Sequence, residues 1–341
     1  MLNIILLLIV MLSSHYAAAK ESSLNEHKVV VATKRIHLDD FPDAWNPSMI
    51  KIDKGFLLIF RYTPDQDSQP WLSYIGIVIL DDLFQPISKP QLLTTRLKNS
   101  ITPSQCEDAR IFLYQDRIFL IYNDNVEVIS PTIWQRRDMF ISELFYRDDR
   151  FTLSSPLKLI HEEKYHSVLW QKNWTPFEKD GSLLITYSIN PHEILYPNLA
   201  TGTCYSAYET RAEIQWDFGT LRGSTPPLLV DGEYLAFFHS GIITSSPSSW
   251  GVNVWHYFMG AYTFSAEAPF EITKMSPLPI MDEEFYTPSD YFKRVIFPGG
   301  FIVSGSSIYV AYGKDDREMW IATLNKDELM KSLVPVKKSD R

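Results

Sequence analysis

The chain has 341 residues, of which 45% are hydrophobic, 21% charged and 14% aromatic. This composition is typical of a globular chain with a large core, and it excludes a disordered tail, a collagen-like fibre and a membrane protein with several spans. The 41 acidic residues outnumber the 32 basic ones, giving a formal net charge of −9 that argues against a nucleic-acid partner, because the phosphate backbone would be repelled.

The first residues of the chain are typical of a secretory signal. An apolar run over residues 4–12 is followed by Ala17, Ala18 and Ala19, which match an A-x-A cleavage site. The run is far shorter than the ~20 apolar residues that cross a bilayer. We therefore expect a signal peptide over residues 1–19, export of the mature chain and no stable membrane span, with an uncleaved anchor as the alternative. Residues 20–341 are expected to form a single domain.

Cys106 and Cys204 are the only cysteines of the chain. Two cysteines do not make a disulfide framework in a domain of this size, so a disulfide and two buried thiols both remain open. Neither cysteine has the spacing of a zinc site, and no metal or cofactor is predicted.

Five segments along the chain share one plan, in which polar residues lead into a short strand, a turn and a second apolar strand that ends in an aromatic residue. The segments are residues 46–61, 107–123, 173–188, 224–239 and 294–313, and the matched aromatics are Phe60, Tyr122, Tyr187, Phe238 and Tyr312. Asp, Gly and other turn residues lie between the two strands of each segment. This pattern predicts five β-hairpins.

Further strand-like runs lie between the hairpins, over residues 74–80, 139–146 and 257–264, and only residues 326–333 favour a short helix. One hairpin cannot bury both of its faces, whereas four-stranded sheets arranged radially can, and they leave few open edges. We therefore predict an all-β fold, a five-bladed β-propeller. A pair of β-sandwiches is the alternative, but it does not account for five similar hairpins over the whole length.

Polar residues stand in front of every predicted hairpin. Because the first strand of each propeller blade lines the axis, these residues should converge on one face, and together they indicate a shared pocket. They include Asn46, Glu107, Asp108, Arg110, Lys172, Asn173, Arg222, Thr225 and Arg294. Trp45, Trp174 and Trp255 are candidates either for stacking on sugar rings or for ordinary core packing.

The motifs in these segments resemble those of the β-mannoside phosphorylases of glycoside hydrolase family 130, which are five-bladed propellers. The similarity runs from about residue 46 to residue 324. The matching motifs are Asn46-Pro47-Ser48 with Phe60-Arg61, Glu107-Asp108-Ala109-Arg110 (with Ala where the family has Pro), Lys172-Asn173, Gly223-Ser224-Thr225-Pro226-Pro227 with Phe238-His239, Val295-Ile296-Phe297-Pro298-Gly299-Gly300, and Ala311-Tyr312-Gly313-Lys314-Asp315-Asp316.

The resemblance implies that Asp108 is the general acid, which protonates the leaving oxygen through a sugar hydroxyl while inorganic phosphate, as co-substrate, attacks the anomeric carbon. Phosphate arrives as an anion, so a second carboxylate is not required as it is in inverting hydrolysis by water. The positions that match phosphate-binding residues are Lys172, Asn173, Arg222 and His239. The positions on the sugar side are Asn46, Ser48, Arg61 and Asp316, with Arg110 either orienting Asp108 or keeping it ionised.

The sequence departs from the family near Ser188, where the phosphorylases carry an arginine. His192 is the nearest substitute for that phosphate-binding cation, whereas Glu193 acting as a base toward water would make the protein a hydrolase. We predict a carbohydrate-active enzyme that takes an oligosaccharide or other β-mannoside as substrate and cleaves it by inverting phosphorolysis to mannose 1-phosphate. Hydrolysis, mannosyl transfer and a non-catalytic sugar-binding propeller are the alternatives, and the oligomeric state is open.

Overall fold

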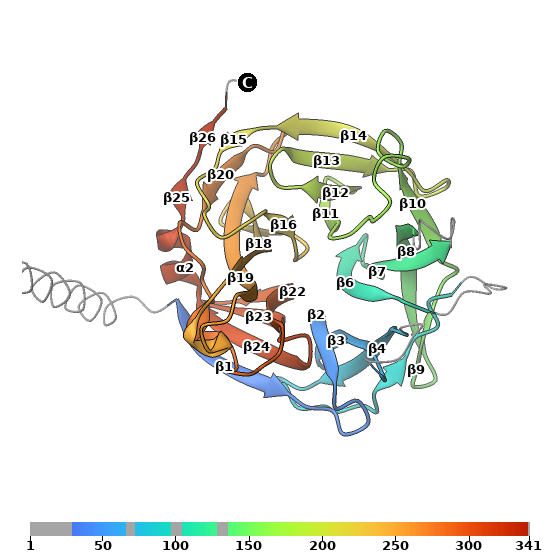
Figure 1. Ribbon diagram of the computed structural model, residues 1–341. Coiled ribbons are helices and arrows are strands. Elements are labelled where there is room, and N and C mark those ends of the chain that lie inside the picture. The colour runs from blue at the N-terminus through green and yellow to red at the C-terminus, as the bar shows by residue number, and fades with distance from the viewer. Residues whose placement is uncertain (1–28, 66–71, 97–103, 128–135, 340–341) are drawn as a thin grey trace, which may run out of the picture.

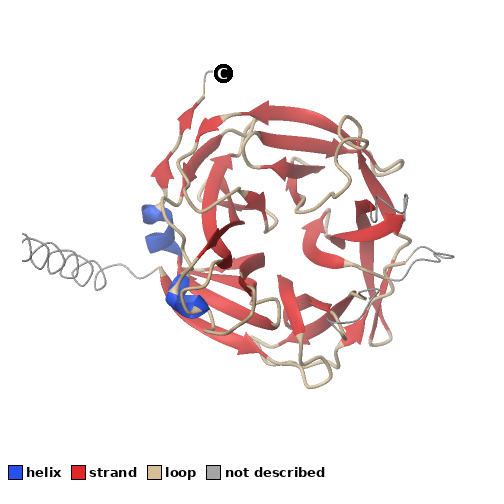
Figure 2. Ribbon diagram, viewed as in Figure 1, coloured by secondary structure: helices blue, strands red, loops and turns tan. Residues whose placement is uncertain are grey.

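Strands make up almost all of the regular structure (Figure 2). A computed structural model describes residues 29–65, 72–96, 104–127 and 136–339. The predicted signal peptide, residues 1–19, lies outside these ranges. Within them, no helix has the length and apolar character needed to cross a membrane.

All five predicted hairpins are present, each as a pair of antiparallel strands joined by a short turn. The pairs are β2 (Ala44–Ile52) with β3 (Gly55–Tyr62), β6 (Glu107–Tyr114) with β7 (Arg117–Glu127), β11 (Thr175–Lys179) with β12 (Ser182–Ser188), β17 (Leu228–Val230) with β18 (Glu233–Thr244), and β22 (Ile296–Ser304) with β23 (Ser307–Lys314).

Further strands extend each hairpin away from its first strand. They are β4 (Tyr74–Leu80) and β5 (Gln91–Leu92); β8 (Arg136–Arg147), β9 (Arg150–Leu153) and β10 (Leu157–His161); β13 (His192–Pro197) and β14 (Thr203–Thr210); β19 (Val254–Ser265), β20 (Ile272–Met275), β21 (Lys293–Arg294) and β25 (Val334–Pro335); and β24 (Glu318–Asn325) with β1 (Val30–Ile36). The short strand β16 (Arg222–Gly223) pairs with β18 on the same side as β17. The predicted strands at 74–80, 139–146 and 257–264 therefore lie in β4, β8 and β19.

The remaining elements are few. The short pair β15 (Ala212–Glu213) and β26 (Lys337–Lys338) lies near the carboxyl end, and two 3₁₀ turns span Pro247–Ser249 and Glu283–Phe285. The predicted helix at 326–333 is α2 (Lys326–Ser332), whose first turn is capped by Asn325 through a 3.0 Å bond from the Glu328 amide to its side-chain oxygen.

The sheets stand around a central axis, with β2, β6, β11, β16 and β22 nearest to it and β1, β9 and β14 toward the outside (Figure 1). This is an all-β, propeller-like arrangement. The chain closes the ring on itself, because β1 pairs with β24 in antiparallel register from Val30 opposite Leu324 to Ile36 opposite Met319.

The core lies between neighbouring sheets rather than at one centre. One apolar cluster joins Leu58 and Phe60 of β3 to Ala311 of β23 and Ile321 of β24, so it packs the first sheet against the last. The matched aromatics at positions 60, 122, 238 and 312 are almost completely buried in such clusters. The hairpin pattern therefore arises because the second strand of each hairpin is covered on both faces.

Both cysteines are buried free thiols that lie in different core clusters. The Cys106 sulfur is 2.8 Å from the Thr95 hydroxyl and 2.9 Å from an Asp124 carboxylate oxygen. The question left open by the sequence is thus settled in favour of two thiols.

Candidate active site

A polar cavity of about 240 Å³ opens on the axis at the leading ends of the inner strands. Eight of the eleven predicted site residues line it, namely Asn46, Arg61, Asp108, Lys172, Asn173, Arg222, His239 and Asp316. The predicted convergence of polar residues from separate hairpins is therefore present in the structure. Six further residues complete the wall, namely Trp45, Glu107, Tyr257, Lys293, Val295 and Phe297.

Four of these residues share a left-handed backbone conformation, which turns their side chains toward the axis. Asn46, Asp108, Asn173 and Asp316 have positive φ angles of 45°, 50°, 64° and 54°. Asn and Asp tolerate this left-handed conformation better than other non-glycine residues. The ladder shifts register between Trp45 and Ser48 and again across Asp108, so a β-bulge at the start of β2 and β6 re-aims one polar side chain.

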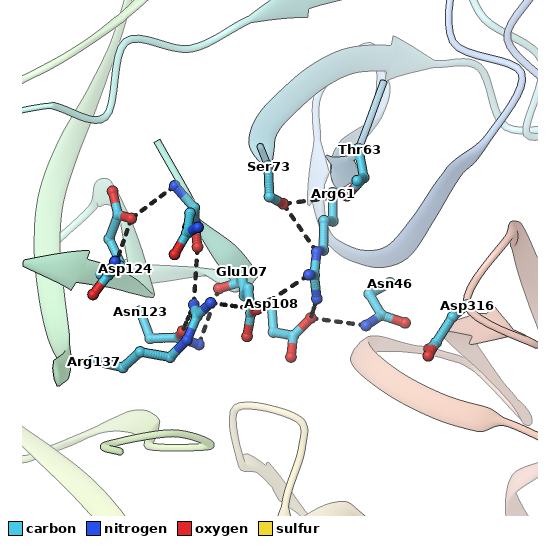
Figure 3. Close-up of polar contacts among 12 residues, drawn as sticks. Asn46, Arg61, Thr63, Ser73, Glu107, Asp108, Asn123, Asp124, Arg137 and Asp316 are labelled. Atoms are coloured by element: carbon cyan, nitrogen blue, oxygen red, sulfur yellow. Dashed lines mark hydrogen bonds and ion pairs between the residues drawn. The ribbon is translucent and has the colours of Figure 1, made fainter. Parts of the chain in front are cut away.

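Asp108 is held by residues of the first hairpin. Its Oδ1 accepts a 2.8 Å bond from the Asn46 amide nitrogen and lies 3.3 Å from Nη1 of Arg61 (Figure 3). Burial alone would raise the pKa of Asp108, but Arg61, Arg110 and Lys172, with the Asn46 bond, outweigh it and hold that pKa below its usual value. The carboxyl group is therefore ionised in the unliganded pocket.

Glu107 lies at the centre of a buried ionic cluster. Its Oε1 is 3.1 Å from Arg61 Nη2 and 3.0 Å from Arg137 Nη2 (Figure 3). Its Oε2 is 2.8 Å from Lys172 Nζ. Burial raises the pKa of Glu107, but the three cations more than compensate and lower it. From the sequence, Glu107 was expected among the polar residues that converge on the pocket but was given no particular role, and Arg137 was not singled out.

Asp316 lines the other side of the cavity, beyond Asn46 (Figure 3). Its Oδ2 lies 2.6 Å from Lys293 Nζ, yet burial, with help from the charge of Asp108, raises the pKa of Asp316. Trp45 lies under Arg61, with the guanidinium carbon 4.1 Å from its ring centre. Lys293 was not predicted as a site residue, although it could have been found from its position next to Arg294 at the front of the fifth hairpin.

The predicted phosphate side comes from β16, β18 and the segment before β11. Arg222 stands opposite His239 in the β16–β18 ladder, and His239 Nδ1 lies 2.6 Å from the Ser224 hydroxyl. Burial and then the charge of Arg222 lower the pKa of His239 well below its usual value, so the ring is neutral. Among the described residues no carboxylate lies within ion-pair distance of Arg222, whose side chain is exposed to the cavity.

Gly223 explains how two segments of this wall come together. A Cβ built on Gly223 would stand 2.6 Å from the carbonyl oxygen of Asn173, which is closer than real contacts allow. Only glycine therefore lets β16 approach the backbone that carries Lys172 and Asn173.

Three predicted site residues do not line the cavity. Ser48 is fully buried and its Oγ accepts a 3.2 Å bond from the Ile111 amide, so it joins β2 to β6 instead of binding sugar. Arg110 is also buried and donates to the carbonyl oxygens of Ser224 and Asp108, so its contact is with the backbone and not with substrate. Its charge nevertheless contributes to the lowered pKa of Asp108.

His192 is the third, and its prediction as a substitute phosphate-binding cation is wrong. Its Nδ1 lies 2.7 Å from the Phe270 carbonyl oxygen, and its ring packs 4.8 Å from that of Phe264. Burial lowers the pKa of His192 to about 4, so the ring is neutral as well as remote from the cavity.

Glu193, the alternative base, also lies outside the cavity wall. Its Oε1 is 2.9 Å from His161 Nε2, and its other oxygen accepts from Lys164. Burial would raise the pKa of Glu193, but these two partners lower it to about 2. Ser188 donates to the Pro191 carbonyl oxygen at 2.7 Å, so neither Ser188 nor His192 provides a cation in place of the arginine that the phosphorylases carry there.

The cavity is cationic in a protein whose net charge is −9. Its wall carries Arg61, Lys172, Arg222 and Lys293 against Glu107, Asp108 and Asp316. Carboxyl groups for proton transfer, polar groups for hydroxyls and cations for an anion are together typical of carbohydrate-active enzymes that transfer a glycosyl group. The fold and the site thus define a propeller-like carbohydrate-active enzyme.

The chain belongs to glycoside hydrolase family 130, since the family model described as β-1,4-mannooligosaccharide phosphorylase matches residues 25–334. The sequence-based assignment to this family is confirmed. No curated protein sequence shows significant similarity to the chain.

Solved structures with the same fold have diverse activities. A β-1,2-mannobiose phosphorylase from Listeria innocua is 16% identical, with 91% of this chain and 95% of that one covered and a TM-score of 0.55. A glycosyl hydrolase from Bacteroides ovatus is 15% identical over 87% of each chain, with a TM-score of 0.56. A GDP-mannose-dependent mannosyltransferase from Leishmania mexicana is 11% identical, covering 91% and 94%, with a TM-score of 0.56.

Proposed function

We propose that the protein is an inverting β-mannoside phosphorylase that releases mannose 1-phosphate. The observation that carries this proposal is Arg222, a cation exposed to the cavity for which the described residues provide no carboxylate partner. Lys172 and the neutral ring of His239 line the same cavity, so an anion bound there has both charge and hydrogen-bond donors available.

In the proposed reaction a phosphate oxygen forms a bond to the anomeric carbon while the bond from that carbon to the glycosidic oxygen breaks. Asp108 supplies a proton, through a sugar hydroxyl, to the departing oxygen. Asn46, Arg61 and Asp316 hold the mannose ring, and Lys172, Asn173, Arg222 and His239 hold the phosphate. Phosphate is already a nucleophilic anion, so the buried and paired Glu193 is not needed as a base.

We also propose that the ring has five blades, each beginning with one of the five hairpins. Five apolar clusters support this count, because each takes side chains from two neighbouring hairpins and their outer strands. Residues 20–341 would then form a single domain, exported after removal of residues 1–19. Amino-terminal sequencing of the protein secreted by its natural host tests the cleavage, which is expected just before Lys20.

The direct test is to incubate the protein with β-1,2- and β-1,4-mannobiose, with and without phosphate. Phosphate-dependent release of mannose 1-phosphate is expected. Free mannose formed at the same rate without phosphate would show that the reaction is hydrolysis and not phosphorolysis. Consumption of GDP-mannose alone would indicate mannosyl transfer. Absence of all three reactions would leave a sugar-binding propeller.

Arg222→Gln is expected to lower kcat/KM for phosphate by roughly 10–100-fold, because it removes a charge-assisted contact to the anion. The KM for the mannoside should stay within a few-fold of the wild-type value. Arg117→Gln is the matched control, since Arg117 lies on the exposed pair with Glu143 and away from the cavity. Equal phosphate kinetics in both variants would contradict the assignment.

The pH profile should depend on phosphate. Arg61, Arg110 and Lys172 hold the pKa of Asp108 low in the unliganded pocket. A bound anion adds negative charge and offsets Lys172, so it should raise that pKa and increase the protonated fraction near neutrality. The alkaline limb of kcat/KM for the mannoside is therefore expected at higher pH with saturating phosphate than with phosphate far below its KM.

The experiment needs the phosphate dianion concentration held constant within each series, so that titration of phosphate itself does not move the limb. An alkaline limb at the same pH in both series would show that the anion does not act on the acid.

Hydrolysis is the second candidate, favoured by one observation. Neither Ser188 nor His192 replaces the arginine that the phosphorylases carry near Ser188, because Ser188 is bonded to Pro191 and His192 lies in the core. The phosphate dependence of product formation separates the two reactions.

A further inference from the structure

The cavity is small for what the proposed reaction requires. At about 240 Å³ it lies below the roughly 300–1,000 Å³ of typical small-molecule sites. A mannoside of two or more rings together with phosphate must therefore extend to the rim. The chemistry of the rim then decides which sugar is accepted next to the cleaved bond.

Trp170 is a large aromatic residue beside the cavity, in contact with the lining residue Lys172. Trp170 is 54% exposed. Its backbone is fixed on both sides by Arg137, whose amide donates to the Leu169 carbonyl oxygen and whose carbonyl oxygen accepts from the Gln171 amide, each at 2.9 Å. An exposed indole on a fixed backbone presents a preformed apolar face at little cost in conformational freedom.

The indole lies on the side of the predicted acid. Its ring centre is 5.2 Å from Lys172 Nζ and 5.7 Å from the guanidinium carbon of Arg137. Both cations bind Glu107, the residue before Asp108. The sugar that leaves takes its proton from the Asp108 side, so it departs past this part of the wall.

We propose that Trp170 is a stacking platform for the leaving-group sugar, packing against the apolar C–H face of that ring. This inference rests on the proposed function. It makes Trp170 a specificity-determining residue for the sugar on the far side of the cleaved bond, which in the reverse reaction is the acceptor. Of the aromatic residues that line the cavity, Trp45 and Phe297 are buried and Tyr257 is only partly exposed.

The reverse reaction tests the platform, because mannose 1-phosphate and the acceptor sugar are then separate substrates. Trp170→Ala is expected to raise the KM for the acceptor about tenfold and to leave the KM for mannose 1-phosphate within twofold, whereas Trp170→Phe keeps most of the acceptor affinity. Tyr196→Ala is the control, since Tyr196 is 50% exposed on β13 and does not line the cavity.

An unchanged acceptor KM in Trp170→Ala would overturn the inference. A parallel rise in both KM values would also overturn it, because it would show that the indole acts only by positioning Lys172 and Arg137. Calorimetric binding of mannose and β-mannobiose without phosphate separates this inference from the proposed reaction. If the wild type binds mannobiose more tightly than mannose and Trp170→Ala loses that difference, the stacking role of Trp170 is supported even where no turnover occurs.

Discussion

Asp108→Asn is expected to lower kcat for mannoside phosphorolysis by about 10²–10⁴-fold, the usual contribution of a general acid. Asparagine is nearly the same size, tolerates the φ of 50° at this position and can still accept the bond from Asn46, so the pocket should keep its shape. It cannot supply a proton to the leaving oxygen. Initial rates of mannose 1-phosphate release, with substrate and phosphate saturating, measure the effect.

Asp116→Asn provides the matched control for this change. Asp116 is an exposed residue in the turn of the same β6–β7 hairpin, and its φ of 58° is also left-handed. It should leave kcat unchanged. If the rate of Asp108→Asn stays within fivefold of wild type while both variants fold, Asp108 is not the acid, and Asp316 becomes the next carboxyl group to test.

Glu107→Gln is expected to cost about 3–5 kcal/mol in the free energy of unfolding, because removing one member of a buried ionic cluster leaves the others uncompensated. Arg137 and Lys172 would lose the carboxylate of Glu107 and Arg61 would lose one of its two carboxylate partners, in a place where the Glu107 side chain is only 5% exposed. Urea unfolding followed by tryptophan fluorescence measures the change. Glu143→Gln breaks the exposed pair with Arg117 and should cost less than about 1 kcal/mol.

The cost of Glu107→Gln should also depend on pH. The cations lower the pKa of Glu107 in the folded protein below its ordinary value of 4.5. The contribution of Glu107 to the free energy of unfolding is therefore fully present above about pH 4.5, and it disappears as the pH falls through the folded-state pKa. The stability difference between wild type and variant should shrink in acid. A difference that stays constant from pH 7 to below pH 4 would show that the ionic cluster is not its cause.

The strand pattern was predictable because the repeated hairpin has a direct physical cause. The second strand of each hairpin is buried on both faces, so it reads as an apolar run ending in an aromatic, as at Phe60 and Tyr312. The closing pair of β1 and β24 left no comparable signal, because five of the seven residues of β1 are exposed on an edge strand.

The site was predictable where polar residues stand on the bulges that open the inner strands, as Asn46 and Asp108 do. It was not predictable where the direction of a side chain decides the outcome. Ser48 is two residues from Asn46, yet it points into the junction of two strands. His192 has the right chemistry for a phosphate ligand, but the strand that carries it faces an aromatic core. Motif position alone does not report these directions.

The pairing of β1 with β24 also constrains when the molecule can be completed. The two strands lie at opposite ends of the chain, so at roughly 5–20 residues per second of synthesis the first waits tens of seconds for the second. During that interval β1 has no partner strand, and its unpaired backbone groups are a template for foreign strands until β24 has been made. A chaperone or a translocation channel that delays folding would protect this protein at the stage where it is most prone to aggregate.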